Sequence, residues 1–476
     1  MLADRIARLT QRRWWLVLIG AALIARLAWA VALAPREPRF DERDYIFHAR
    51  TLAEGKGYIN QEGRRTAYWP VGYPLVLAIC YRVVGDSLLT GVALQMILGV
   101  ATTALISVIG SEFFGPRVGR SAALLVAIYP THVFYATLHM TEPLFTLLFV
   151  ISAALFLKGL VRGAAATAAA GFVIGLAALA RGVILPLPFV LLIWYWHQKW
   201  SFWKILTRTT LAICFTLIAA SPWLARNHGL TGSWHVTSTN GGHNFWIGNY
   251  PGAFGGPTAY RTEINEQLRT PVGSIPEEFF PDGSGWSPSQ GYSLGLAAIG
   301  ASPTRALRLA FQKVTYFFAL ETDGVLWNLK GLPQPSKLIA VVLLGIANAA
   351  YLFVLTFAIL GLMGTPRTNP FASLFLVLTG YLVLVAVVFV GDPRYHYALV
   401  PLAAIFSAKG FIEDWPVLWK GMKENDSGVR RRLFRWAGIV VVFFMLMTAN
   451  VVLKFLEFKA HLALPGTIPH SLGYDG

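Results

Sequence analysis

The chain has 476 residues, of which 55% are apolar and only 13% are charged. Soluble domains carry roughly 45–50% apolar and about 25% charged residues, so this composition excludes a soluble enzyme, a disordered chain and a disulfide-rich secreted domain. In a soluble protein, a net charge of +16 would suggest binding to nucleic acid. In a membrane protein it indicates basic inner loops. We therefore expect no nucleic-acid partner.

The apolar residues gather in runs that are long enough to cross a bilayer. The first run, residues 14–34, has about twenty residues, enough to span about 30 Å of hydrocarbon. Ten more follow, at 87–110, 118–130, 142–160, 164–180, 184–197, 207–222, 338–361, 371–391, 396–412 and 437–456. The sequence therefore predicts an all-α polytopic membrane protein with about eleven transmembrane helices.

The basic residues predict the orientation of these helices. With the N-terminus in the cytoplasm, the inner loops are consistently basic, as at 430–432, whereas the short outer connection 131–141 has no Lys or Arg. The predicted organisation is an N-terminus with the first span (1–34), a first outer loop (35–86), spans two to seven (87–222), a long outer loop (223–336), spans eight to eleven (337–457) and an outer tail (458–476).

The long outer loop has two features of its own. A loop of this length usually carries a function or a small fold. In residues 303–320, apolar residues recur at helical spacing with basic residues between them, which predicts an amphipathic helix at the membrane interface. Residues 240–249 are rich in Gly and Asn and contain Trp246, which suits either sugar contacts or a packed turn.

Acidic residues close to a bilayer are costly and are seldom incidental. Asp41, Glu42, Glu142 and Asp392 all fall at the outer face of the predicted topology. Each alone could cap a helix, interact with a helix dipole or form a turn. Their convergence on one face favours a functional site.

Basic residues share this face. Arg181, Arg226, Arg394 and His396 lie close to outer helix ends. The planar fork of arginine suits a phosphate, although a snorkelling or topological role explains any one of them equally well. Together these charges suggest a lipid-phosphate substrate and a polar acceptor.

Motifs for nucleotides and metals are missing from the sequence. No GxxxxGK[ST] occurs, and no GxGxxG follows a strand pattern. No HExxH or close ligand pair occurs either. We therefore assign no metal ligand and no certain cofactor, and we leave a divalent metal open.

The site residues stand in an order that resembles the GT-C membrane glycosyltransferases, and most closely their ArnT-like and protein O-mannosyltransferase group. The matching segments run from about residue 40 to 410: Phe40-Asp41-Glu42 with Tyr45, Tyr68-Trp69-Pro70-Val71-Gly72-Tyr73-Pro74, Thr141-Glu142-Pro143, Ala180-Arg181-Gly182, Pro222-Trp223 with Arg226-Asn227, residues 242–249 and residues 392–401.

This resemblance implies a GT-C fold with juxtamembrane helices near 42–54 and 72–84 in the first outer loop. It also implies transfer of a sugar from a polyprenyl-phosphate carrier to a lipid, glycan or protein of the envelope, at the periplasmic face of the bacterial inner membrane and among its lipids. Asp41, Glu42 and Glu142 are the expected catalytic residues. Arg394 and Tyr395 match the motif expected near the carrier phosphate.

Further residues are expected to bind the carrier phosphate and the substrate. Arg181, Arg226 and His396 are assigned to the carrier phosphate. Assigned to substrate binding are Tyr45, Tyr73, His243, Asn244 and Asn249.

One departure limits the resemblance. Lipid A aminoarabinose transferases have Glu-Lys-Pro-Pro in the first loop, where this chain has Tyr68-Trp69-Pro70-Val71. The metal and phosphate roles of that Glu and Lys cannot be transferred, which weakens a lipid A aminoarabinose assignment.

The expected reaction is a single displacement with inversion at the sugar. An enzyme that uses a pyrophosphate-linked glycan is an alternative within catalysis. The alternative from another class is a transporter or flippase of a lipid-linked or anionic substrate. Transporters place polar groups near the bilayer midplane in related halves, whereas here the charges gather at one surface and no repeat is visible.

Overall fold

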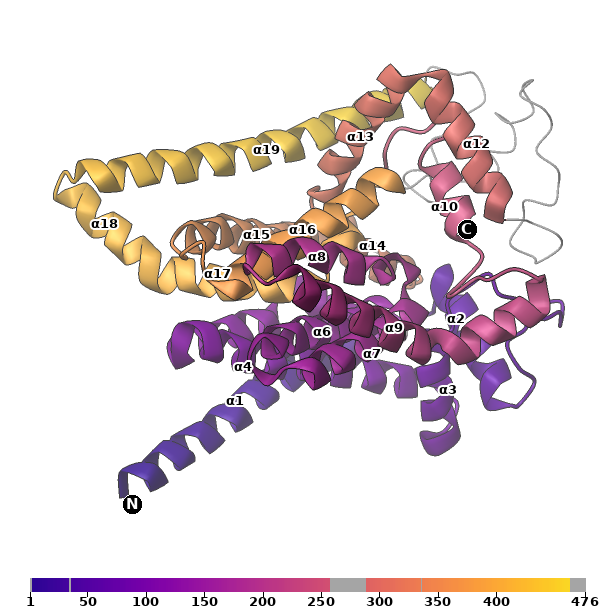
Figure 1. Ribbon diagram of the computed structural model, residues 1–476, viewed down its shortest axis with the longest axis horizontal. Coiled ribbons are helices and arrows are strands. Elements are labelled where there is room, and N and C mark those ends of the chain that lie inside the picture. Colours follow the sequence, from indigo (N-terminus) through magenta and orange to yellow (C-terminus); the bar gives the residue numbers. More distant parts are fainter. Residues whose placement is uncertain (1, 34–35, 257–287, 335, 463–476) are drawn as a thin grey trace.

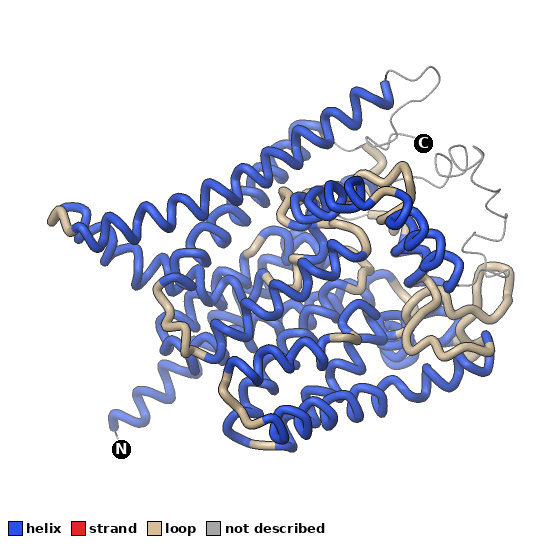
Figure 2. Tube along the Cα trace, turned by 45° about the horizontal axis from the view of Figure 1, so that its top comes forward, coloured by secondary structure: helices blue, strands red, loops and turns tan. Residues whose placement is uncertain are grey.

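The computed structural model describes residues 2–33, 36–256, 288–334 and 336–462. Within these ranges the chain forms helices joined by turns and loops, without a β-sheet strand among them (Figures 1 and 2). Residues 257–287 of the predicted long loop and residues 463–476 of the predicted tail lie outside the described residues.

Long apolar helices dominate the bundle. Among the described residues, seven helices are long and apolar enough to cross a membrane: α1 (Leu2–Ala32), α4 (Leu88–Ile128), α6 (Glu142–Arg162), α9 (Phe202–Thr231), α15 (Lys337–Met363), α16 (Pro370–Val388) and α19 (Ser427–Leu462). Shorter helices lie between them: α5 (Pro130–Phe134), α7 (Ala164–Ala180), α8 (Leu187–His197), α17 (Val400–Lys409) and α18 (Trp415–Lys423). The predicted all-α polytopic membrane fold is confirmed, and the number of crossings stays a prediction.

Helix α4 is a hairpin of two helices. Gly115 has a φ of +84°, which favours glycine, and the following Pro116 lacks an amide donor, so the helix breaks there. A Cβ atom on Gly110 would lie only 2.7 Å from the Cα atom of Gly119, whereas nine residues of straight helix rise about 13 Å. The chain therefore reverses at Gly115, and the predicted runs 87–110 and 118–130 lie side by side.

The predicted first outer loop contains two helices. Helices α2 (Asp41–Ala53) and α3 (Gly72–Val84) lie where juxtamembrane helices were predicted, and they pack against each other. A Cβ atom on Gly72 would lie 2.6 Å from the backbone nitrogen of Ala180. This close approach holds the start of α3 against the end of α7, next to Arg181.

The described part of the long loop is also helical. It contains α10 (Gly241–Ile247), α12 (Pro288–Ala301), α13 (Pro303–Phe317) and α14 (Asp323–Lys330). Helix α13 matches the predicted amphipathic segment, and it packs against α16 and α19. The buried ammonium of Lys313 on α13 donates to Asn249 Oδ1 and to the carbonyl of Val387, both at 2.9 Å. This lysine thereby ties three segments of the chain together.

The helix hairpin yields a test of packing. A Cβ atom on Gly119 would lie 2.3 Å from the backbone nitrogen of Ser111, so we expect Gly119→Ala to lower the unfolding temperature in detergent. Overpacking of this kind costs about 1–3 kcal/mol. Gly345 has no atom within 4 Å of such a Cβ, so Gly345→Ala should leave the unfolding temperature unchanged or slightly raised. Equal unfolding temperatures for the two variants would contradict the hairpin.

Candidate active site

The candidate site lies where the ends of several helices meet. Asp41 opens α2, Glu142 opens α6, and Asp323 opens α14. Arg181 follows the last residue of α7, and Arg394 lies in the turn between α16 and α17. Residues that are far apart in the sequence are therefore brought to one end of the bundle.

The guanidinium of Arg394 contacts three carboxylates. Its Nη2 lies 3.0 Å from Asp392 Oδ2, its Nε lies 3.6 Å from Asp323 Oδ2, and its Nη1 lies 3.9 Å from Asp41 Oδ2. Burial alone would lower the pKa of Arg394, but the carboxylates around it, Asp392 first, raise that pKa well above its ordinary value. Arg394 therefore stays charged.

Asp392 fixes the turn that carries Arg394. Its Oδ1 accepts a hydrogen bond of 2.8 Å from the backbone N–H of Arg394, as in a helix cap. Its Oδ2 accepts a second bond of 3.0 Å from Arg394 Nε. Burial would raise the pKa of Asp392, but the charge and hydrogen bonds of Arg394 lower it below the ordinary value. Asp392 is thus an ionised positioning group for the arginine.

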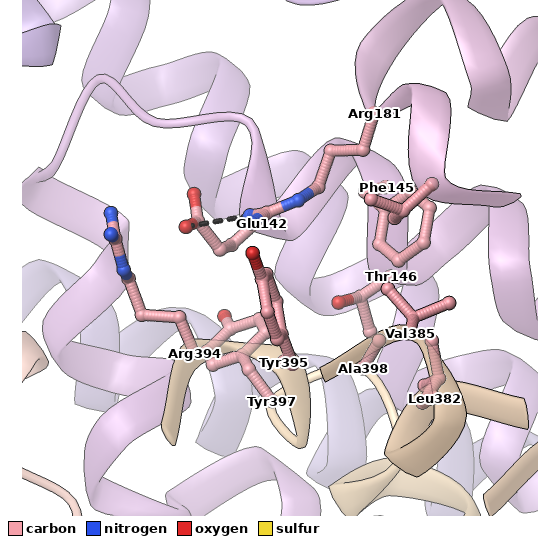
Figure 3. Close-up of a pocket in the computed structure, with 11 residues that line it drawn as sticks. Glu142, Phe145, Thr146, Arg181, Leu382, Val385, Arg394, Tyr395, Tyr397 and Ala398 are labelled. Atoms are coloured by element: carbon pink, nitrogen blue, oxygen red, sulfur yellow. Dashed lines mark ion pairs between the residues drawn. The ribbon is translucent and has the colours of Figure 1, made fainter. Parts of the chain in front are cut away.

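A second ion pair lies beside the first. Arg181 Nη1 is 2.7 Å from Glu142 Oε1, and the Glu142 side chain is buried. The guanidinium of Arg181 also lies over the ring of Tyr395, 5.6 Å from its centroid. Figure 3 shows the Glu142 carboxylate between the side chains of Arg181 and Arg394. Two arginines with separate acidic partners therefore face the same space.

That space is a small, partly open cavity, which we name the first cavity. Its charged lining comes from Glu142, Arg181 and Arg394, with Tyr395 and Tyr397 beside them. The apolar lining comes from Phe145, Val183, Leu382, Val385 and Ala398. The cavity thus joins an arginine pair to an apolar wall.

The carboxyl group of Asp41 lies at the edge of this charged group. Desolvation raises the pKa of Asp41 to about 6, because the lowering effect of Arg394 only partly offsets burial and Glu142 raises the pKa further. A third of the side chain is exposed. Near neutral pH the group is mostly a carboxylate, and its raised pKa makes it a better proton acceptor than an ordinary aspartate.

Glu42, which was predicted beside Asp41 as catalytic, faces a different set of partners. It forms a buried ion pair with Arg36, and its Oε1 accepts a hydrogen bond of 2.9 Å from the backbone N–H of His139. Burial would raise the pKa of Glu42, but the bonds from His139 and Arg36 lower it. Successive helix residues point about 100° apart, so Glu42 serves to hold α2 against the segment before α6.

Two residues assigned to the carrier phosphate also have structural partners. Arg226 donates to the carbonyls of Thr66 at 2.6 Å and Tyr58 at 3.0 Å, which ties α9 to the first loop. His396 is buried, and its Nδ1 lies 2.6 Å from the carbonyl oxygen of Phe317. The structure places neither side chain in the lining of the first cavity.

The residues assigned to substrate binding are spread over two regions. Tyr45 and Tyr73 are buried with their ring centroids 5.8 Å apart, and Tyr45 lies within electrostatic reach of Asp41. In the long loop, Asn249 Nδ2 donates to the carbonyls of Phe245 and Val388, His243 is half-buried near Tyr68, and Asn244 is exposed. None of the five lines the first cavity.

Sequence reasoning missed two neighbours of Arg394. Asp323 forms an ion pair with it, and the indole ring of Trp327 lies 5.4 Å from its guanidinium carbon. Both belong to α14, inside a long polar loop in which charged residues do not stand out. The available signal was the Thr322-Asp323 pair ahead of a short helix, a sequence typical of a helix start.

Within the described residues, no group of three or more His, Cys, Asp or Glu side chains is arranged to hold a metal ion.

The comparisons with known proteins agree with this architecture. Residues 69–225, about a third of the chain, match the family model described as dolichyl-phosphate-mannose-protein mannosyltransferase. In fold, the chain is similar to the apo oligosaccharyltransferase of Archaeoglobus fulgidus, with a TM-score of 0.50, 13% identity, and coverage of 93% of this chain and 56% of that one. The resemblance to GT-C membrane glycosyltransferases is confirmed.

Two further solved structures are similar to this chain. The archaeal oligosaccharyltransferase AglB from Archaeoglobus fulgidus, in complex with an inhibitory peptide and a dolichol-phosphate, gives a TM-score of 0.45 at 13% identity, over 94% of this chain and 56% of that one. ArnT from Cupriavidus metallidurans, bound to undecaprenyl phosphate, gives a TM-score of 0.42 at 14% identity. The match covers 83% of this chain and 76% of that one. The chain spans little more than half the length of the archaeal structures. No curated protein matches the sequence.

The separate positions of Asp41 and Glu42 give a test. Glu42→Ala leaves the buried cation of Arg36 without its partner, so we expect a loss of about 3–5 kcal/mol in the free energy of unfolding. Asp41→Asn, at a partly exposed position, should change the unfolding free energy by less than about 1 kcal/mol. Thermal unfolding of both variants in one detergent measures the difference. Equal stability would show that Glu42 is not a structural anchor.

Proposed function

We propose that the chain is a membrane glycosyltransferase that takes a sugar from a polyprenyl-phosphate carrier and passes it to an acceptor of the cell envelope. The observation that carries this proposal is the first cavity, in which Arg181 and Arg394 face an apolar wall while Glu142 lies between them. An apolar wall suits a prenyl chain, and paired arginines suit its phosphate. The family model that matches residues 69–225, described by a dolichyl-phosphate-mannose donor, supports the same substrate class.

The two arginines have a direct role in this chemistry. As the bond between the sugar and the phosphate breaks, negative charge develops on the leaving phosphate oxygen. Positive groups that are already in place stabilise this charge without reorganising. Asp392 positions Arg394, and Glu142 holds Arg181, so both guanidinium groups are fixed before the substrate arrives.

Asp41 is the proposed general base. An acceptor hydroxyl oxygen attacks the anomeric carbon, its proton passes to the Asp41 carboxylate, and the bond from the anomeric carbon to the phosphate oxygen breaks. The carrier leaves as polyprenyl phosphate. One displacement of this kind inverts the configuration at the sugar. Glu142 is the second proposed catalytic carboxylate, which acts by holding Arg181.

The proposed setting is the periplasmic face of a bacterial inner membrane, with the N-terminus in the cytoplasm. The basic inner loops and the gathering of site residues at one end of the bundle support this orientation. The same gathering weighs against a transporter, which would place its polar groups near the bilayer midplane.

Replacement of the base tests the proposal in cells. In a strain that lacks the chain, mass spectrometry of lipid A, core glycan and envelope proteins should show one missing sugar mass, which names both the sugar and the acceptor. The intact chain should restore that mass. Asp41→Asn should reduce restoration at least a hundredfold, because general-base catalysis contributes about 10²–10⁴-fold.

The matched control is Asp86→Asn. Asp86 is an exposed aspartate paired with Arg50 at 2.9 Å, so this variant should restore the full mass. Full restoration by Asp41→Asn would remove Asp41 from the mechanism.

The raised pKa of Asp41 sets the pH dependence. The base must be deprotonated, so kcat/KM should fall as the pH drops through about 6, by about tenfold at one unit below. The inflection should disappear in the residual activity of Asp41→Asn and persist in Glu142→Gln. A profile that stays flat from about pH 7.5 to about pH 5 would contradict the assignment.

A further inference from the structure

Phe40 comes directly before the proposed base and has a strained backbone. Its φ is +50° and its ψ is −130°, in the half of backbone space that glycine favours and a bulky residue avoids. The residue is also 53% exposed, so burial does little to offset this strain. Strained residues of this kind gather at functional sites. The fold does not require a phenylalanine here, which points to a role for its exposed ring.

One face of α14 lies against this ring. Asp323, Trp327 and Lys330 are spaced four and three residues apart, which places them on the same side of a helix. The indole of Trp327 meets the Phe40 ring edge to face, with 5.6 Å between the centroids. The ammonium of Lys330 lies 5.1 Å from the centroid of the Phe40 ring. We name the rings of Phe40 and Trp327 the aromatic platform.

The aromatic platform is continuous with the proposed catalytic groups. The guanidinium carbon of Arg394 lies 5.4 Å from the centroid of the Trp327 ring. Arg394 Nη1 in turn lies 3.9 Å from Asp41 Oδ2, and a third of the Asp41 side chain is exposed. Phe40 and Asp41 are consecutive, so their Cα atoms are about 3.8 Å apart. A ligand on the platform is therefore within reach of the Asp41 carboxylate.

Hydrogen bonds to the backbone fix the platform before a ligand binds. The N–H of Glu37 donates to the carbonyl of Gly331 at 3.0 Å, which joins the segment before Phe40 to the end of α14. Arg36 Nη2 donates to the carbonyl of Trp327 at 3.3 Å. Groups that are fixed in this way lose little freedom when a ligand binds, so the platform is preorganised.

We propose that the aromatic platform binds a pyranose ring of the acceptor, so that the acceptor is a glycan and one of its ring hydroxyls receives the new sugar. The inference rests on the proposed function and names the class of its acceptor. The ring hydroxyl gives its proton to Asp41, and its oxygen forms the bond to the anomeric carbon of the donor sugar. The bond from that carbon to the phosphate oxygen breaks, and polyprenyl phosphate leaves.

The chemistry of the platform favours a sugar ring over the other acceptors. The C–H groups on the face of a pyranose carry partial positive charge, and they pack on the negative face of an aromatic ring. The hydroxyls at the edge of the sugar need hydrogen-bonding partners, which Asp41 and Lys330 offer beside Phe40. An acyl chain would cover these charged groups without pairing them. A serine or threonine side chain has no flat face to place on an aromatic ring.

Transfer to a mixed extract tests the class of acceptor. The purified full-length protein receives a labelled synthetic polyprenyl-phosphate hexose and a detergent extract of envelope lipids, glycans and proteins from cells that lack the chain. Mass spectrometry of the product should show the hexose bonded to a hydroxyl of another sugar ring. Label on an amino-acid side chain, a phosphate group or a lipid hydroxyl outside a sugar would overturn the inference and leave the proposed function intact. Absence of any transfer would instead contradict the proposed function.

Substitutions of Phe40 separate binding from folding. Phe40→Gly suits the local backbone, so its unfolding temperature in detergent should not fall. Loss of the ring should raise the KM for the glycan acceptor about tenfold and change the KM for the donor less than about twofold, as expected for one lost aromatic contact. Phe40→Trp keeps an aromatic face, so its acceptor KM should stay within about threefold of the wild-type value.

The matched control is Phe202→Ala. Phe202 is 69% exposed at the start of α9, whereas Arg226 near the end of that helix contacts Thr66. This variant should leave both KM values unchanged. An unchanged acceptor KM in Phe40→Gly, or an equal rise in both KM values, would overturn the inference. A lower unfolding temperature of Phe40→Gly would also overturn it, because the ring would then serve the fold.

Discussion

The guanidinium of Arg394 holds together parts of the chain that are far apart in sequence. Asp41 comes from the start of α2, Asp323 from the start of α14, and Asp392 from the turn that carries Arg394 itself. A buried cation is tolerated only when it is paired, so this arrangement requires all three segments to meet. The first cavity takes part of its lining from this arginine.

The carboxylates lie at different distances from the guanidinium of Arg394, and their pKa values differ accordingly. Asp392 lies 3.0 Å from the guanidinium and has a lowered pKa, whereas Asp41 lies 3.9 Å away and has a pKa of about 6. The ion pair of Arg181 and Glu142 is shorter than both of these contacts, with 2.7 Å between Nη1 and Oε1. Asp41 therefore accepts a proton more readily than Asp392, which fits a general base beside a fixed pair of cations.

Much of this site could be predicted because charges are rare in so apolar a chain. The topology placed Asp41, Glu142, Arg181 and Arg394 at one membrane face, and the structure brings their side chains together. The same reasoning could not tell on which side of a helix a charge lies. Glu42 is adjacent to Asp41 but turned about 100° round the helix, toward Arg36.

Other assignments depended on contacts that no pattern reveals. Arg226 and Asn249 are polar residues near the predicted site, but backbone carbonyls of neighbouring segments take up their donors. Asp323 was missed because it lies in a polar loop, where a single charged residue gives no sign of a functional site. The helices of the first loop were predicted closely because their residues and spacing resemble a known family.

We propose that a bond between a sugar and a phosphate is broken at this site. The direct measurement follows a labelled sugar and the carrier together, with purified protein, a synthetic polyprenyl-phosphate hexose and a detergent extract of envelope lipids, glycans and proteins. We predict that bare polyprenyl phosphate appears in an amount equal to the sugar bound to an acceptor. Movement of the intact carrier across reconstituted vesicles, with no polyprenyl phosphate released, would contradict the claim and identify a transporter.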